Sequence, residues 1–224
     1  MFSRSARITF ALGAVVFVAG CQGARADDAT PLPDVANAPP LAAMAGRDSV
    51  LLAGGCFWGL EAVFERVNGV TEVVSGYAGG TTRNPTYERV SSGSTGHAEV
   101  VKVVFDPSVV SYADLMKVFF SVVHDPTQLN RQGPDHGTQY RSAVYYASPA
   151  QRAMTDQYIA QLTKAKTFSA PIVTEVAPWG QFFEAEAYHQ GYYDLHPSQP
   201  YIVYNDKPKV EALKKQFPAL YRDR

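Results

Sequence analysis

Residues 54–59, with the sequence Gly-Gly-Cys-Phe-Trp-Gly, constrain the fold more than any other part of this chain. The apolar run before them, at residues 50–53, is typical of a buried strand. The apolar residues after them recur at the spacing of one helix face. This pattern predicts a strand that turns into a helix, with Cys56 at the turn, where unpaired N–H groups and the helix dipole favour negative charge. We therefore expect a thiol that ionises readily and acts as a nucleophile; the alternative is that Cys56 is a small buried hydrophobe.

The first 26 residues have the pattern of a targeting segment and are left out of the predicted fold. Arg4 and Arg7 precede an apolar run at residues 8–20, which is too short to span a bilayer. Two cleavage patterns follow: residues 18–21 resemble a bacterial lipobox ending in Cys21, and residues 24–26 fit ordinary secretory cleavage. Both predict export to the periplasm, and the first adds a lipid anchor at Cys21. The Ala/Pro-rich residues 27–47 are expected to form a tether or a disordered linker.

The cysteine count and the charge narrow the function classes. The chain has two cysteines, and Cys21 lies in the leader, so the mature domain would hold Cys56 alone. A single free thiol in an exported domain is a candidate reactive group. Removing residues 1–26 takes away three arginines, so the formal charge changes from −1 to 17 − 21 = −4. A mildly acidic chain without a Lys/Arg cluster argues against nucleic-acid binding.

The remaining pattern alternates between strands and helices within one catalytic domain, residues 48–206. Helix starts are marked by Ser111 and Ser148, each followed three residues later by a capping-box partner, Asp114 or Gln151. Residues 182–195 are rich in aromatic side chains and stay ambiguous, and residues 207–224 are expected to be a tail with a short surface helix. This order predicts an α+β two-layer sandwich, with helices packed on a mixed or antiparallel sheet and a ferredoxin-like core. The expected strands cover residues 69–77, 97–105, 142–147 and 172–176.

Two polar features stand out in this pattern. Glu99 shares one face of its predicted strand with Val101, Val103 and Phe105. A carboxyl on an apolar face is either paired or has a raised pKa, although a strand-end glutamate that reaches solvent fits equally well. The polar loop at residues 130–140 is long for a compact domain, and such loops are usually functional.

Together these features resemble the class A peptide methionine sulfoxide reductases, from about residue 49 to residue 204. The resemblance implies an oxidoreductase that repairs oxidative damage by reducing methionine S-sulfoxide, free or in proteins, without a cofactor. The matching segments are Gly-Cys-Phe-Trp-Gly at 55–59, Asn-Pro-Thr-Tyr at 84–87, Gly-His-Ala-Glu at 96–99, Gln-Gly-Pro-Asp at 132–135 and Gly-Thr-Gln-Tyr-Arg-Ser at 137–142.

By resemblance, Cys56 is the nucleophile and Glu99 is the acid that protonates the sulfoxide oxygen. The chemistry supports this pairing, because a sulfoxide sulfur is a poor electrophile until its oxygen is protonated or strongly hydrogen-bonded. Such an enzyme needs a thiolate on one side and an acid that is neutral near pH 7 on the other. The products would be methionine and a cysteine sulfenic acid.

The resemblance also assigns the binding residues. Tyr87, Asp135 and Tyr140 are expected to bind the sulfoxide oxygen, directly or through water, and such donors would stabilise charge developing there. Phe57 and Trp58 are expected to form the apolar pocket for the substrate's methyl group. Each has a plainer interpretation: the aromatic residues as ordinary core side chains, and Asp135 as part of its Pro-Asp turn.

One departure from the family concerns recycling, since many members carry resolving cysteines near the C-terminus and this chain has none after Val176. We therefore expect an external, thioredoxin-like thiol to reduce the sulfenic acid. The five histidines lack the spacing of metal ligands, so no metal is expected, and Glu186 and His189 are placed near the pocket without a role. We expect a monomer. Two rival functions stay open: a single-cysteine thiol peroxidase or redox sensor, and a non-catalytic peptide-binding module.

Overall fold

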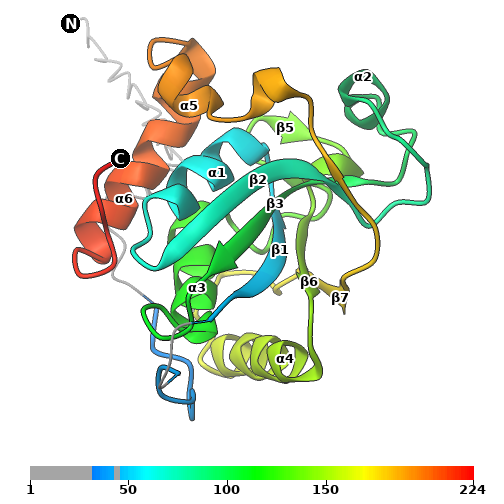
Figure 1. Ribbon diagram of the computed structural model, residues 1–224. Coiled ribbons are helices and arrows are strands. Elements are labelled where there is room, and N and C mark those ends of the chain that lie inside the picture. The colour runs from blue at the N-terminus through cyan, green and yellow to red at the C-terminus, as the bar shows by residue number, and fades with distance from the viewer. Residues whose placement is uncertain (1–31, 43–45) are drawn as a thin grey trace, which may run out of the picture.

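The computed structural model describes residues 32–42 and 46–224, and its central feature there is one curled six-stranded sheet (Figure 1). A separate two-stranded hairpin lies in the loop that the sequence marked as functional. The strands of the sheet are β1 Asp48–Gly54, β2 Val70–Ala78, β3 Ala98–Phe105, β6 Ser142–Tyr146, β7 Glu175–Pro178 and β8 Phe182–Glu184, and those of the hairpin are β4 Arg131–Gln132 and β5 Asp135–His136.

The strand order in the sheet is β7-β6-β1-β3-β2-β8. Every neighbouring pair is antiparallel except β6 and β7, which are parallel, so the sheet is mixed, as predicted. The inner order β6-β1-β3-β2 with helices between the strands is that of the predicted ferredoxin-like core. The helices are α1 Phe57–Glu65, α2 Tyr87–Ser91, α3 Tyr112–Val118, α4 Pro149–Lys164, α5 Tyr192–Leu195 and α6 Lys207–Gln216, with π-helical turns at Phe119–Val123 and Ile202–Asp206 and 3-10 turns at Thr138–Tyr140 and Ala187–His189.

The two edges of the sheet are joined by a very short connection, which forces the sheet to curl. In a flat sheet, five gaps of ~4.8 Å would separate β7 from β8 by about 24 Å. Only residues 179–181 lie between Pro178 and Phe182, and a fully extended chain of that length reaches ~14 Å. The edges therefore approach each other, and the inner face of the curl is filled by a small apolar cluster that includes Leu51, Val100 and Tyr145.

The main core lies on the helix side of the sheet. Val50 and Leu52 of β1 alternate with Leu51, which points to the other face. Residues Val101, Val103 and Phe105 of β3 share this core, on the strand face that the sequence assigned to them. Figure 1 shows α1 and α6 side by side and α3 near α4 on the outside of the sheet.

The predicted capping boxes are fully formed at one helix and half formed at the other. At α3, the Asp114 N–H donates to Ser111 Oγ (3.0 Å) and the Ser111 N–H donates to Asp114 Oδ2 (3.1 Å). At α4, the Gln151 N–H donates to Ser148 Oγ (3.2 Å). The Gln151 side chain, however, accepts from the Ala147 N–H (2.8 Å) and so fixes the chain one residue earlier than predicted.

Two expected elements differ from the structure. The strand expected at residues 172–176 begins only at Glu175, because the Val173 N–H donates to the Pro126 carbonyl (2.8 Å) instead of to a neighbouring strand. The helix expected on the surface after residue 206 is α6, and it is part of the core, since Val210, Ala212 and Leu213 are buried.

Part of the expected linker is also packed against the domain. Val35 is buried, the Tyr158 hydroxyl donates to the Pro33 carbonyl (2.8 Å), and the Ala42 N–H donates to the Pro107 carbonyl (2.9 Å). Residues 32–42 are therefore not a free tether. The division of the chain at residues 26, 47 and 206 stays a prediction, and the leader and Cys21 lie outside the described residues.

No helix within residues 32–42 and 46–224 is both long enough and apolar enough to cross a membrane.

Candidate active site

Two glycines form the turn between β1 and α1, each for a different reason. Gly55 has a φ of +99°, a conformation that favours glycine. A Cβ atom at Gly54 would lie 2.9 Å from Cγ of His124, so the imidazole ring fills the space that a side chain would need. Contacts of the His124 ring nitrogens with the Phe119 carbonyl (3.1 Å) and Ser142 Oγ (2.7 Å) fix the ring. Burial lowers the pKa of His124 to about 4, so the ring is neutral and structural.

Cys56 is the N-cap residue of α1, and only 8% of it is exposed. Burial raises the pKa of the thiol well above its ordinary value, and the charges of Glu99 and Asp206 raise it further, against the Trp58 backbone N–H and the Lys209 ammonium. The expected readily ionised thiol is therefore wrong for this structure. A helix N-terminus favours an anion by about 0.3–1 kcal/mol, whereas full burial can shift a pKa by up to 3–5 units, or about 4–7 kcal/mol.

Strand register brings Glu99 to this turn. Leu52 of β1 pairs with Val101 of β3 in antiparallel register, so two residues further on Glu99 lies beside Gly54. The Phe57 N–H, the first backbone donor after the thiol residue, donates to Glu99 Oε2 at 3.1 Å. The carboxyl is thus fixed at the start of α1 by a backbone group of the same motif that carries the thiol.

The electrostatics of Glu99 agree with the acid hypothesis. Glu99 is 1% exposed, so the alternative of a strand-end glutamate that reaches solvent is wrong. Burial, followed by the charges of Asp135 and Asp206, raises the pKa of Glu99 to about 8, against the lowering effect of the Phe57 N–H. A carboxyl with this pKa is mostly protonated at neutral pH and can donate a proton.

Tyr87 is fixed by a glutamate from the C-terminal third of the chain. Tyr87 is the first residue of the short helix α2. Its N–H donates to Glu186 Oε1 (2.9 Å), and the Tyr77 hydroxyl donates to the other oxygen of the same carboxylate (2.8 Å). These hydrogen bonds lower the pKa of Glu186 against the effect of burial, so it is a charged anchor for the start of α2.

Tyr140, in the polar loop at residues 130–140, lies near the carboxyl of Glu99. The neighbouring Gln139 Nε2 donates to the Ser91 carbonyl at the end of α2 (2.8 Å), which ties the loop to that helix. After burial, the charge of Glu99 is the largest influence that raises the pKa of both phenols, and the pKa of Tyr87 reaches about 12. Both hydroxyls are therefore near Glu99 and stay neutral hydrogen-bond donors at physiological pH.

Asp135 also lies near Glu99, but its carboxylate is already hydrogen-bonded within the protein. It lies on β5, and its carboxylate accepts a hydrogen bond from the Tyr201 hydroxyl. Burial raises the pKa of Asp135, while Tyr201 and Lys209 lower it. The structure thus brings together all five polar residues predicted from the sequence: Cys56, Glu99, Tyr87, Asp135 and Tyr140.

Trp58 is held in one orientation by aromatic residues of the C-terminal segment. Its ring stacks on Tyr192 with centroids 3.8 Å apart and meets Tyr201 edge-on at 5.9 Å. The indole N–H donates to His189 Nδ1 at 3.1 Å. Phe57 is fully buried against His189, with ring centroids 5.0 Å apart. The structure does not test the expected part of Trp58 and Phe57 in methyl binding, which stays a prediction.

Most of what the end of the chain contributes to the site was not predicted from the sequence. Glu186 and His189 had been placed near the pocket without a role, and here they hold Tyr87 and Trp58. Nothing pointed to Tyr201, and the aromatic richness of residues 182–195 was the one available signal. Two residues further along the chain, Asp206 and Lys209, act on the pKa of the Cys56 thiol: Asp206 raises it and Lys209 lowers it.

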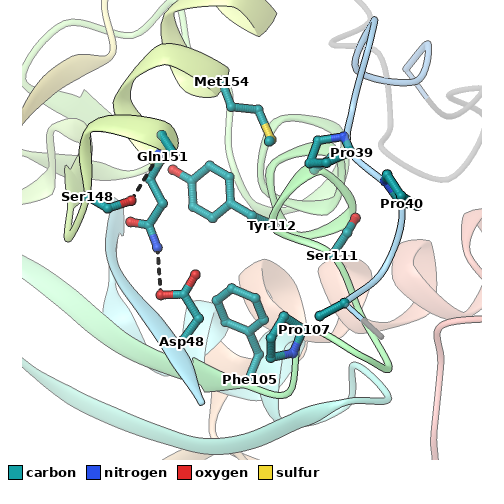
Figure 2. A pocket seen from close by; sticks show the side chains of 13 residues that line it. Pro39, Pro40, Asp48, Phe105, Pro107, Ser111, Tyr112, Ser148, Gln151 and Met154 are labelled. Carbon is teal, nitrogen blue, oxygen red and sulfur yellow. Dashed lines mark hydrogen bonds between the residues drawn. The ribbon is translucent and has the colours of Figure 1, made fainter. Parts of the chain in front are cut away.

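A hollow away from Cys56 and Glu99 is a poor candidate for catalysis. Figure 2 shows it between the starts of α3 and α4 and the N-terminal segment, with Tyr112, Met154 and several prolines around it. Its polar groups are already engaged: Ser148 caps α4, and Gln151 Nε2 donates to Asp48 Oδ1 (3.0 Å). In the part of the chain that the structure describes, no three His, Cys, Asp or Glu side chains are grouped to hold a metal ion.

Known proteins are similar to this chain over most of its length. A family model described as "Peptide methionine sulfoxide reductase" matches residues 48–220. "Peptide methionine sulfoxide reductase MsrA 2" of Mesorhizobium japonicum is 52% identical over 179 residues, which cover 80% of this chain and 92% of that protein. The structure is similar to methionine sulfoxide reductase A of Corynebacterium diphtheriae, with a TM-score of 0.61, 36% identity, and coverage of 75% of this chain and 87% of that one. It is also similar to Mxr1 of Saccharomyces cerevisiae in reduced form, with a TM-score of 0.61, 32% identity, and coverage of 72% and 94%.

Replacing Glu99 with glutamine should change how the free energy of unfolding depends on pH. The folded pKa of about 8 lies above the ordinary 4.5, so the protonated carboxyl contributes its full stability below pH 4.5, and this is lost as pH rises through 8. The glutamine of Glu99→Gln stays neutral at every pH. The free energy of unfolding of this variant should therefore rise relative to that of the wild type as pH increases, by roughly 3–5 kcal/mol near pH 9.

Denaturant unfolding at pH 5, 7 and 9 measures this difference, with the exposed Glu184→Gln as the matched control. A gap between Glu99→Gln and the wild type that does not change with pH would contradict a buried carboxyl that titrates near 8.

Proposed function

Because the chain belongs to the class A peptide methionine sulfoxide reductases, which are oxidoreductases, we propose that it reduces the S-epimer of methionine sulfoxide to methionine. The observation that carries this proposal is the buried Glu99 carboxyl, with a pKa of about 8, held by the Phe57 N–H at 3.1 Å next to the only thiol of the described residues. A protonated acid beside a cysteine sulfur is the pair that sulfoxide reduction requires. The substrate is methionine sulfoxide, free or in proteins, and the biological role is repair of oxidative damage.

In the proposed reaction, Glu99 gives its proton to the sulfoxide oxygen while the sulfur of Cys56 attacks the sulfoxide sulfur. One thiol and one sulfoxide are consumed, and one sulfenic acid and one thioether are formed. The proton released by the thiol balances the proton donated by Glu99, so the pair can return to its starting charge.

At neutral pH Glu99 and Cys56 each hold a proton, and the ionisation of one affects the ionisation of the other. With the carboxylate ionised, its charge keeps the neighbouring sulfur protonated; with the carboxyl protonated, that repulsion is removed and a thiolate becomes accessible. Burial is the largest cause of the raised pKa of the thiol, and protonation of Glu99 removes the next largest, so the acid that activates the substrate is also the group whose neutral form favours the thiolate.

The remaining residues have supporting roles. The neutral hydroxyls of Tyr87 and Tyr140 donate hydrogen bonds to the sulfoxide oxygen as negative charge develops there. Asp135, oriented by Tyr201, contributes to the same oxygen site directly or through water. Trp58, fixed by its aromatic neighbours, provides apolar surface for the substrate's methyl group.

The rival functions explain less of this site. A thiol peroxidase or redox sensor needs a reactive thiol, but not a neutral carboxyl flanked by two phenols. A non-catalytic peptide-binding module needs aromatic surface, but neither a thiol nor an acid.

Turnover assays with separated substrate epimers test the proposed function. The S-epimer of methionine sulfoxide should be reduced with dithiothreitol as the electron donor, because one fixed acid and one fixed sulfur allow attack from one side only. The R-epimer should be consumed at least a hundredfold more slowly, on the order of the discrimination that misplaced reacting groups produce. Hydrogen peroxide is the control, and faster consumption of peroxide than of the S-epimer would favour the peroxidase.

Recycling has to come from outside the chain. After Cys21, the sequence holds no cysteine besides Cys56, so an oxidised Cys56 has no partner in the folded domain. The reductant we propose is a thioredoxin-like protein that attacks the sulfenic sulfur directly. The leader at residues 1–26 supports export to the periplasm, by a lipid anchor at Cys21 or by ordinary cleavage, and we propose that the exported protein acts there as a monomer.

One turnover without reductant should leave a sulfenic acid on Cys56. Mass spectrometry after dimedone trapping should find the adduct on the Cys56 peptide, and Cys56→Ser should form neither the adduct nor methionine while keeping its fold. A disulfide between Cys56 and Cys21 in the full chain would contradict the scheme and identify the leader as a resolving arm.

The acid role of Glu99 gives a kinetic prediction. Glu99→Gln should slow methionine formation in a single turnover by roughly 10²–10⁴-fold, because glutamine can donate a hydrogen bond but cannot transfer a proton. Quenched-flow measurement at pH 7 determines the rate, with Glu184→Gln as the unaffected control. An unchanged rate would remove Glu99 from the mechanism.

A further inference from the structure

Two charged residues from the end of the chain lie against the first turn of α1. Asp206 closes the π-helical turn Ile202–Asp206, and Lys209 is in the first turn of α6. A Cβ atom at Gly59 would lie 2.2 Å from Asp206 Oδ1 and 2.9 Å from Lys209 Nζ. The last glycine of the Gly-Gly-Cys-Phe-Trp-Gly motif therefore leaves space for this ion pair, three residues from Cys56.

The pair is buried and incompletely satisfied. Asp206 Oδ1 and Lys209 Nζ are 3.1 Å apart, the Asp206 side chain is 0% exposed, and that of Lys209 is 15% exposed. Asp206 Oδ2 is buried and has no hydrogen-bond partner among the residues that the structure describes. A buried carboxylate with one unpaired oxygen is costly. Stability alone therefore does not explain why an acid occupies this position.

The surroundings of the thiol show what the pair can do. Besides burial, the carboxyls of Glu99 and Asp206 raise the pKa of the thiol and the ammonium of Lys209 lowers it, so residues at the end of the chain contribute to the electric field at the sulfur. Neutral groups complete the shell. The charged groups that face Cys56 are Glu99 of β3, Asp206 and Lys209, and Asp135 of β5 faces Asp206. Among the neutral groups, Tyr87, Tyr140 and Tyr201 face Cys56, Tyr193 faces Asp206, and His124 faces Lys209.

We propose that Asp206 and Lys209 are positioning residues that set how readily the Cys56 thiol gives up its proton, the carboxylate holding the proton on sulfur and the ammonium limiting that effect. The inference rests on the proposed role of Cys56 as the nucleophile. It also suggests a reason for the arrangement: a thiolate is more easily oxidised than a thiol, and this domain has no second cysteine to protect its sulfur by forming a disulfide. The Asp206 carboxylate thus adds to the effect of burial that keeps the thiol protonated while no substrate is bound.

Opposite effects of the two charges separate this role from simple packing. Asp206→Asn removes a negative charge with little change in shape, so the thiol should ionise at lower pH. Lys209→Met removes the positive charge and should have the opposite effect, whereas Lys209→Arg keeps the charge and should match the wild type. Loss of packing alone would shift both single variants in the same direction or in neither.

The experiment is iodoacetamide alkylation of the reduced full chain across pH 6–11, read peptide by peptide in a mass spectrometer. The alkylation rate at Cys56 is proportional to the fraction of the thiol that is ionised. Below the pKa of the thiol, this fraction changes tenfold for each unit by which the pKa shifts. Cys21 in the same molecule is an internal reference. Near pH 8, Asp206→Asn should react at least threefold faster than the wild type and Lys209→Met at least threefold slower, with the double variant between them. Lys102→Met, which breaks the partly exposed ion pair with Glu72 (3.2 Å), is the control and should not change the rate.

Circular dichroism establishes whether each variant is folded. If Asp206→Asn does not fold, comparing Lys209→Met with Lys209→Arg still shows whether loss of the positive charge slows alkylation of Cys56. Equal alkylation rates in all folded variants, or shifts of the same sign in both single variants, would overturn the inference. Alkylation needs no sulfoxide, so failure of the proposed reductase activity would leave these results independent. Conversely, normal sulfoxide reduction with unchanged thiol reactivity would refute the inference alone.

Discussion

Antiparallel pairing of β1 with β3 is the constraint on which the site depends. It fixes the position of Glu99 relative to the end of β1, where the chain turns into α1 and carries Cys56. A slip of one residue would put Glu99 on the opposite face of the sheet, away from the thiol. The large apolar side chains of β3, including Val101, Val103 and Phe105, oppose such a slip because their burial in the main core depends on the same register.

Burial changes the ionisation of both Glu99 and Cys56. In water, a glutamate and a cysteine would titrate separately near their ordinary pKa values. Here the curled sheet and the helices remove both groups from solvent, so the carboxyl stays protonated up to about pH 8 and the thiol becomes difficult to ionise. The Phe57 N–H links the two by fixing Glu99 at the start of the thiol-bearing helix. The same desolvation that costs stability places a proton donor and a nucleophile side by side.

The end of the chain completes the site although it lies far from the other groups in sequence. Glu186 fixes the start of α2, His189 and Tyr192 fix the indole of Trp58, and Tyr201 orients Asp135. Asp206 and Lys209 then bring opposite charges to the first turn of α1.

The sequence by itself determined the local features. An apolar run followed by two glycines predicted the strand-to-helix turn at Cys56, and strand alternation placed Glu99 on the apolar face. Short motifs also identified the polar residues that the fold brings together. These predictions succeeded because hydrophobic period, capping and turn chemistry depend on residues a few positions apart.

Only the tertiary structure decided the ionisation of Cys56 and the contributions of Tyr201, Asp206 and Lys209. The helix N-terminus at Cys56 could be recognised in the sequence, but the desolvation that outweighs it is a property of the packed domain. Likewise, the strand expected at residue 172 was displaced by a hydrogen bond to the distant Pro126. The physical reason is common to these cases: burial and charge act through space between groups that are far apart in sequence, as far as the 153 residues from Cys56 to Lys209, and no local pattern records which of them meet.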